Sequence, residues 1–168
     1  MSNLESFEFP GLKKPKWLKF KKWHVVLLSS IALYVLSAYI KLSPSSVIVG
    51  DYAGECMGYC HNTYVITNSS IVIDRKSGMD TLPPIHKNIK GNFEQLKFSV
   101  PLRLLFRISG DFGYPDGHDQ GGYILGFKLL GMSFSYNIDK GSEPWYFSNM
   151  TDIVIDRIHT INTQIPFK

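Results

Sequence analysis

The sequence has few charged residues and no cluster of basic residues in its larger part. Asp, Glu, Lys and Arg make up 19% of the 168 residues. Residues 42–168 carry eleven basic and twelve acidic side chains, so this part of the chain is close to neutral. A groove for a nucleic-acid backbone needs Lys and Arg gathered on one face. The charge distribution therefore predicts that the protein does not bind nucleic acid.

The chain also lacks internal repeats, low-complexity tracts and the length for two hydrophobic cores. A hydrophobic content of 44% together with the low charge argues against a long disordered tail protein, a collagen-like fibre and a multi-domain enzyme. Residues 42–168 can bury one modest core but not two. We therefore expect a single folded domain in this part of the sequence.

The net positive charge of the protein is concentrated at the start of the chain. Residues 1–22 hold six lysines and two glutamates, and Trp23 to Ile40 follow without a charged side chain. As a helix this run would span about 27 Å, with Trp and Tyr at its ends as interfacial anchors. We interpret residues 1–22 as a basic cytoplasmic leader and residues 23–41 as an uncleaved transmembrane signal anchor in the lipid bilayer. A cleaved signal peptide and a buried helix are the alternatives.

By the positive-inside rule, this interpretation fixes the topology of the whole chain. The lysine-rich leader stays in the cytoplasm, because basic residues beside a span are retained there. Residues 42–168 then form an exported domain in the periplasm or outside the cell. The expected localisation is a single-pass membrane protein.

Hydrophobic periodicity in the exported part predicts an α+β fold. Short apolar runs that alternate with polar residues or flank turn residues predict strands, and spacings of three and four residues predict helices. We expect Tyr64 and Ile66 to pair with Ile71 and Ile73 across a hairpin, and a small antiparallel sheet covered by helices. The predicted strands are residues 47–52, 64–66, 71–73, 123–130 and 132–138, and the predicted helices are two short ones within 92–108 and a third from Ser148 to about Pro166. The third helix is expected to bury one apolar stripe, formed by Met150, Val154, Ile158 and Ile161.

The segment from Gly54 to His61 contains both cysteines of the chain. In an oxidising compartment two cysteines suggest one disulfide. Residues four apart in an extended strand are about 13 Å apart, so a bridge between Cys56 and Cys60 requires a turn, which Gly58 permits. Free buried thiols remain an alternative. So does a metal or catalytic site that joins Cys56, Cys60 and His61 with His118 or Asp119, although this cysteine spacing is looser than in zinc knuckles.

The loop from Asp111 to Gly122 contains three carboxylates and a histidine among glycines. Hard oxygen ligands on a flexible loop can hold calcium, but the spacing does not match an EF-hand. A turn-rich connection whose Asp side chains bond their own backbone is the favoured interpretation. We predict no metal, no cofactor and no catalytic residue. The candidate ligand or ion loop comprises Asp111, Asp116, His118 and Asp119.

These two segments resemble a group of uncharacterised exported bacterial proteins and lipoproteins. That group has a Gly-Glu-Cys-x-Gly-Tyr-Cys stretch and a Pro-Asp-x-x-Asp-x-Gly-Gly loop, matched here by residues 54–60 and 115–122. The similarity in element order extends over most of residues 47–163. Some relatives have two further cysteines beside the Pro-Asp pair, where this chain has Tyr114 and Gly117, which favours an optional local disulfide over a shared four-cysteine metal site. The resemblance implies no activity.

The sequence favours a binding module over an enzyme. A small membrane-tethered domain that meets an unknown protein or ligand partner requires no catalytic motif, and no Gly-x-Ser-x-Gly motif is present. A subunit of a larger membrane complex is a further hypothesis. The enzymatic alternative is a thiol-based or hydrolytic enzyme that uses Cys56 and Cys60 or Asp116, His118 and Asp119.

Overall fold

The computed structural model describes residues 22–37, 39–54, 56–78, 82–107, 109–113 and 121–165. The chain divides into two compact units, Met1–Leu36 and Ser37–Lys168. Each unit is described by itself. The described part of the first unit is helix α1 (Lys22–Ser37) up to Leu36, and the second unit contains the strands and helix α2 (Ser148–Gln164).

Helix α1 is too short to be the predicted membrane anchor. It has 16 residues, or about 24 Å, against a hydrocarbon layer of about 30 Å. Its hydroxyl groups also lower its apolar character, and Ser29 and Ser30 both donate hydrogen bonds to the Val26 carbonyl. The chain is already extended at Lys41–Leu42, which form strand β1. A membrane-crossing helix is not found among the described residues.

The interpretation of residues 23–41 as a transmembrane anchor is therefore wrong. The single-pass topology and the localisation of residues 42–168 outside the cytoplasm were derived from that anchor, and both are withdrawn with it. The expected contact with a lipid bilayer loses its basis in the same way. The large apolar side chains of α1 are 41–66% exposed.

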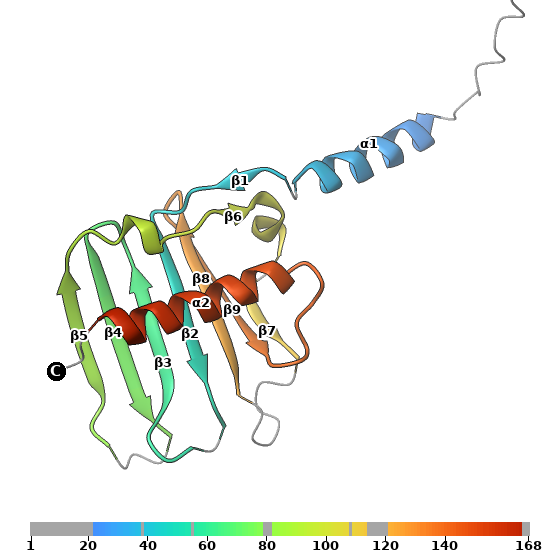
Figure 1. Cartoon of the computed structure of the whole chain (residues 1–168). Coiled ribbons are helices and arrows are strands. Elements are labelled where there is room, and N and C mark those ends of the chain that lie inside the picture. Colours follow the sequence, from blue (N-terminus) through green and yellow to red (C-terminus); the bar gives the residue numbers. More distant parts are fainter. Residues whose placement is uncertain are drawn as a thin grey trace, which may run out of the picture. The chain divides into compact units, whose positions relative to one another are not determined.

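The second unit is built on a seven-stranded sheet with the strand order β5-β4-β3-β2-β8-β9-β7 (Figure 1). Every neighbouring pair is antiparallel except β7 and β9, which are parallel. A separate two-stranded sheet joins β1 to β6. The strands of the second unit beyond β1 are β2 (Ser46–Tyr52), β3 (Tyr59–Ile66), β4 (Ser70–Ser77), β5 (Ile85–Lys90), β6 (Val100–Pro101), β7 (Gly110–Phe112), β8 (Gly122–Leu129) and β9 (Met132–Asp139).

The predicted fold, a small antiparallel sheet covered by helices, is wrong in the size of the sheet and in the helices that cover it. The prediction missed β5 and β7, the two edge strands of the large sheet, because they contain few apolar residues and none that is fully buried. In Ile85–Lys90, for example, the two isoleucines are separated by His86, Lys87 and Asn88. The two helices expected within residues 92–108 are short 3₁₀ turns, Glu94–Leu96 and Leu102–Phe106. A large sheet, a two-stranded sheet and two α-helices replace the small sheet covered by helices.

Several predicted elements are confirmed, because their signals are local. Tyr64 pairs with Ile73, and Ile66 pairs with Ile71. The hairpin of β8 and β9 turns through Leu130 and Gly131, which both have positive φ angles. Helix α2 begins at Ser148, the predicted position, although Phe147 rather than Ser148 is its N-cap.

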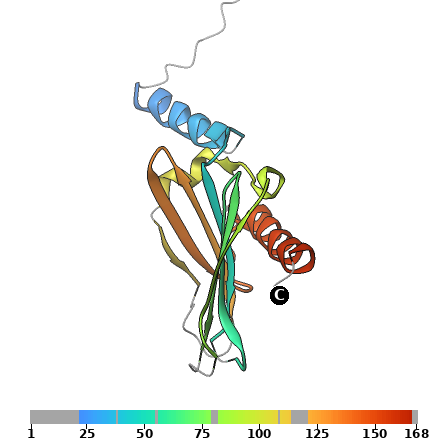
Figure 2. The same ribbon diagram turned by 90° about the vertical axis from the view of Figure 1, so that its left-hand side faces the viewer.

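The hydrophobic core lies between α2 and one face of the large sheet. Figure 2 shows α2 on one side of the sheet only. We call that side the covered face and the other side the open face. Three residues of the predicted stripe, Met150, Val154 and Ile161, are buried in the core, whereas Ile158 is only partly buried against it. The largest fully buried side chains include Tyr64, Tyr136, Phe127, Phe147 and Ile66.

Candidate functional site

The register of the strands arranges the covered face in rows that run across the sheet. One row is entirely buried and belongs to the core. A strand turns every second side chain to the same face, and the paired residues of neighbouring strands therefore share a face. The buried row consists of Ile73, Tyr64, Val49, Leu125 and Tyr136.

The next row on the same face is polar. Arg75 pairs with Asn62, Asn62 with Asp51, and Asp51 with Tyr123, so four adjacent strands each contribute one side chain. We call these four residues the polar row. All four are half-buried. The covered face thus changes from apolar to polar between two neighbouring rows, which are two residues apart on each strand.

The polar row forms the floor of a cleft beside α2. The cleft has a volume of about 610 Å³, which lies in the usual range for small-ligand sites. Its helical wall consists of positions spaced by three and four residues, so they lie on one stripe of α2 next to the core stripe. The residues that line the cleft beside the polar row are Tyr59, Tyr64, Lys140, Ile155, Ile158, His159 and Asn162.

One hydrogen-bonded cluster connects the floor of the cleft to α2. Arg75 Nη2 donates to Tyr64 Oη at 3.0 Å and to Asn162 Oδ1 at 2.8 Å. Tyr64 Oη in turn donates to Asn162 Oδ1 at 3.0 Å. Burial raises the pKa of Tyr64, and the nearby Arg75 cation partly offsets this increase. The cluster therefore holds three side chains of the cleft in fixed positions.

Asp51 and Asn62 lie side by side in the middle of the floor. Asn62 Nδ2 donates to Asp51 Oδ2 at 3.1 Å. Among the described residues Asp51 has no ion pair with a cation, and Asn62 Oδ1 is buried without a hydrogen-bond partner. Buried polar atoms are usually satisfied. This part of the floor therefore has acceptor capacity that the described side chains do not use.

Tyr123 and Lys140 occupy the opposite end of the cleft from Arg75. Lys140 Nζ lies 5.5 Å from the centre of the Tyr123 ring, a cation–π contact. Burial raises the pKa of Tyr123, and the negative charges of Glu143 and Asp51 add to this effect. Positive groups thus lie at both ends of the cleft, with a carboxylate between them.

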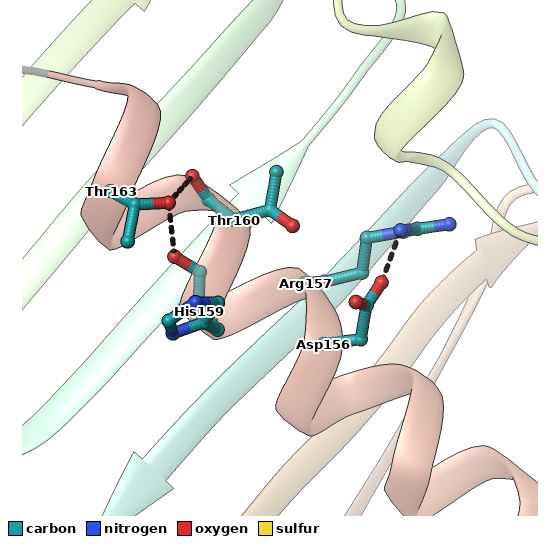
Figure 3. A network of polar contacts seen from close by, with 5 residues as sticks. All are labelled: Asp156, Arg157, His159, Thr160 and Thr163. Carbon is teal, nitrogen blue, oxygen red and sulfur yellow. Dashed lines mark hydrogen bonds and ion pairs between the residues drawn. The ribbon is translucent and has the colours of Figure 1, made fainter.

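The last turns of α2 carry polar groups on more than one side (Figure 3). Thr163 Oγ1 donates to the His159 carbonyl at 2.9 Å and to the Thr160 carbonyl at 3.2 Å, which satisfies acceptors at the helix end. Asp156 and Arg157 pair with each other at 2.6 Å. These two residues do not line the cleft, whereas the His159 side chain does.

The predicted cysteine pair lies next in sequence to Tyr59, a residue that lines the cleft. Cys56 and Cys60 form a disulfide that closes the turn between β2 and β3. The turn contains Gly58, which the prediction named as permitting a turn and which has a φ angle of +127°. Cys60 is 4% exposed. Its neighbour Tyr59 lines the cleft, so the disulfide restrains the chain beside the site.

The predicted acidic loop is described only in part. Asp111 lies in β7 and accepts a hydrogen bond from Asn137 Nδ2 at 2.6 Å. Its pairing with Asn137 places it on the open face, away from the polar row. Asp116, His118 and Asp119 lie outside the described residues. No group of metal-ligating side chains occurs in the part of the chain that the structure describes.

The residues that line the cleft were not predicted from the sequence. Asp51, Asn62 and Arg75 each lie at a core-facing position of a predicted strand or its extension. A polar residue at such a position was the available signal, since Val47, Val49 and Asp51 share one face by simple alternation. Only the pairing of four strands shows that these positions form one row.

Comparison with protein-family models, curated proteins and solved structures finds no match to this chain.

Proposed function

We propose that the second unit is a non-enzymatic binding module whose ligand occupies the cleft between the polar row and α2. The observation that carries the proposal is the placement of the polar row on the covered face of the sheet. Polar residues on the open face of the sheet would not interrupt the hydrophobic core, because the core lies on the covered face. A row of half-buried polar residues beside the core instead suits recognition, because such groups fix the orientation of a ligand.

The chemistry of the lining supports binding rather than catalysis. The described lining has tyrosine hydroxyls but no Ser, Thr or Cys side chain that could act as a nucleophile. The sulfur atoms of Cys56 and Cys60 are bonded to each other, which does not favour the thiol enzyme. The hydrolytic alternative rests on Asp116, His118 and Asp119, and its geometry is outside the described residues.

The proposal is tested by NMR titration of the full-length chain with a panel of small metabolites. The panel contains amino acids, nucleotides, organic acids, amines and sugars, each at millimolar concentration. We expect at least one member to shift the amide signals of Asp51, Asn62 and Tyr123. If no member shifts them, or if the shifts lie on the open face, the proposal is wrong.

A matched pair of variants connects any binding to the cleft. Asp51 and Asp74 are both half-buried strand residues, but Asp74 lies on the open face, where it pairs with His86. Asp51→Asn keeps the shape of the side chain and removes its charge. We expect Asp51→Asn to change the affinity and Asp74→Asn to leave it unchanged. Equal effects of the two variants would contradict a site in the cleft.

A further inference from the structure

The charges around the cleft balance one another. Asp51 lies between Arg75 and Lys140 in the order of the strands, and Glu143 acts electrostatically on Tyr123 beside Lys140. The Arg75 guanidinium already donates to Tyr64 and Asn162. A strongly anionic ligand would meet Asp51 at the centre, and a strongly cationic ligand would meet a positive group at either end. The arrangement therefore favours a ligand without net charge.

Hydrogen-bond donors and acceptors are mixed along the same floor. The Asp51 carboxylate is an acceptor, whereas the Lys140 ammonium is a donor. The Asn162 amide nitrogen is a further donor, because its oxygen already accepts from Tyr64 and Arg75. A hydroxyl group both donates and accepts, so it can meet either kind of partner. A ligand with several hydroxyl groups can therefore form hydrogen bonds with both the donors and the acceptors along the floor.

Apolar surface lies beside the polar floor. Ile155 is 41% exposed, and it lines the cleft together with Ile158 and the ring of Tyr123. Aromatic and aliphatic side chains of this kind pack against C–H groups while polar neighbours bond the hydroxyls. A sugar ring presents both kinds of surface. The polar row crosses four strands, or about 14 Å from Arg75 to Tyr123, which is longer than one sugar ring.

We propose that the cleft binds a short neutral oligosaccharide. This inference rests on the proposed function, since it names the ligand class of the same cleft. Hydroxyl groups of the sugar bond the Asp51 carboxylate at the centre of the floor. The sugar rings pack on Tyr123 at one end and on Ile155 and Ile158 along the helix.

The first experiment is a glycan array probed with the full-length chain, followed by NMR titration. The array carries neutral, sialylated and sulfated glycans, and the titrations use maltotriose, cellotriose and chitotriose, with ATP, inorganic phosphate and spermidine as charged probes. We expect a neutral oligosaccharide to bind and to shift the signals of the polar row. Its affinity is expected to change less than about twofold between low and high salt, because screening weakens mainly charged ligands.

Variants of Tyr123 test the packing of a sugar ring. Tyr123→Phe keeps the ring and removes only the hydroxyl, so we expect the affinity to stay within about threefold. Tyr123→Ala removes the ring and is expected to weaken binding by about tenfold or more. Asp74→Asn on the open face is the control for both. Urea unfolding of each variant shows whether it folds. If Tyr123→Ala does not fold, the affinity of Tyr123→Phe still tests whether the ring without its hydroxyl is enough for binding.

The possible outcomes separate this inference from the proposed function. If ATP, phosphate or spermidine shifts the polar row and no saccharide does, the ligand class is wrong while the binding function stands. If Tyr123→Phe weakens saccharide binding as much as Tyr123→Ala, ring packing is wrong. If nothing binds in the cleft, both proposals fail.

Discussion

Tyr136 shows how one buried hydroxyl joins distant parts of the second unit. Its side chain is fully buried between aromatic rings, including Phe127 and Phe147. Its hydroxyl donates to the Leu104 carbonyl at 2.8 Å, which attaches a 3₁₀ turn to the central sheet. Burial raises the pKa of this phenol from 10.0 to about 12. The folded state therefore holds the proton more tightly than the unfolded state does.

The phenol of Tyr136 predicts a loss of stability at high pH. Above pH 10 the unfolded chain loses this proton and the folded chain keeps it, so the free energy of unfolding falls as the pH rises towards 12. The loss is about 2 kcal/mol at the end of that range. Tyr136→Phe is expected to cost about 1 kcal/mol at neutral pH and to make the alkaline decline shallower. Urea unfolding from pH 7 to 11.5 measures both, and an unchanged decline in the variant would contradict this assignment.

Gly50 marks a close approach of two backbones in the middle of the sheet. A Cβ atom at this position would lie 2.4 Å from the Asn62 carbonyl oxygen and 3.3 Å from Ile124 Cβ. The carbonyl belongs to a strand that is paired with β2 and cannot move alone. Glycine is therefore required here for space rather than for its backbone angles.

A glycine pair tests the requirement for space. We expect Gly50→Ala to lower the free energy of unfolding by about 1–3 kcal/mol, as overpacking does in a closed site. Gly110→Ala in β7 is the control, because a Cβ atom there meets no atom within 4 Å, and its effect should stay within about 0.5 kcal/mol. The comparison uses urea unfolding of both variants. Similar values for the two would show that the strands can separate to admit a methyl group.

At the scale of the element, tertiary packing rather than local contacts fixes α2. The helix has no side-chain cap at its N-terminus. Its ion pair between Asp156 and Arg157 lies at an exposed carboxylate, where such a pair contributes little. Its buried stripe, in contrast, is fully enclosed at Val154 and Ile161. The same packing sets the position of the neighbouring stripe that lines the cleft.

Two alanine variants of α2 separate packing from surface charge. Ile161→Ala is expected to lower the free energy of unfolding by about 2–5 kcal/mol, because it leaves a cavity in the core. Asp156→Ala removes the ion pair drawn in Figure 3 and should change stability by no more than about 0.5 kcal/mol. Thermal and urea unfolding give both values. A larger effect for Asp156→Ala would mean that surface charge holds the helix.

At the scale of the whole molecule, the two units differ in how they are stabilised. Every described residue of the hydrophobic core belongs to the second unit. No residue of helix α1 is part of this core. A helix of this length is marginal in water without tertiary contacts. The second unit therefore contains the contacts that make folding cooperative.

Removal of the first unit is expected to leave the second unit folded. A chain that begins at Ser37 keeps β1, both sheets and α2. We expect its free energy of unfolding to stay within about 0.5 kcal/mol of that of the full chain. Circular dichroism and urea unfolding measure the difference. Loss of the cooperative transition would show that residues 1–36 contribute to the core.

The sequence by itself determined the elements whose signals are local. The alternation of residues 64–73 predicted the register of the hairpin between β3 and β4, and the stripe from Met150 to Ile161 predicted the buried face of α2. The spacing of the two cysteines predicted a turn near Gly58 for the case in which they are bridged. In each case the signal lies within a few residues, because strand and helix periodicity do not depend on a distant partner.

Only the tertiary structure decided which segments are neighbours. Strand β2 pairs with β3 nearby and with β8 some 75 residues further along the chain, and no periodicity in the sequence encodes that choice. The same pairing joins Arg75, Asn62, Asp51 and Tyr123 into one row. The 3₁₀ turn Leu102–Phe106 is likewise attached to a distant strand, through the hydrogen bond from the Tyr136 hydroxyl to the Leu104 carbonyl. Burial and hydrogen bonding between distant strands decide these features, and both are properties of the assembled fold.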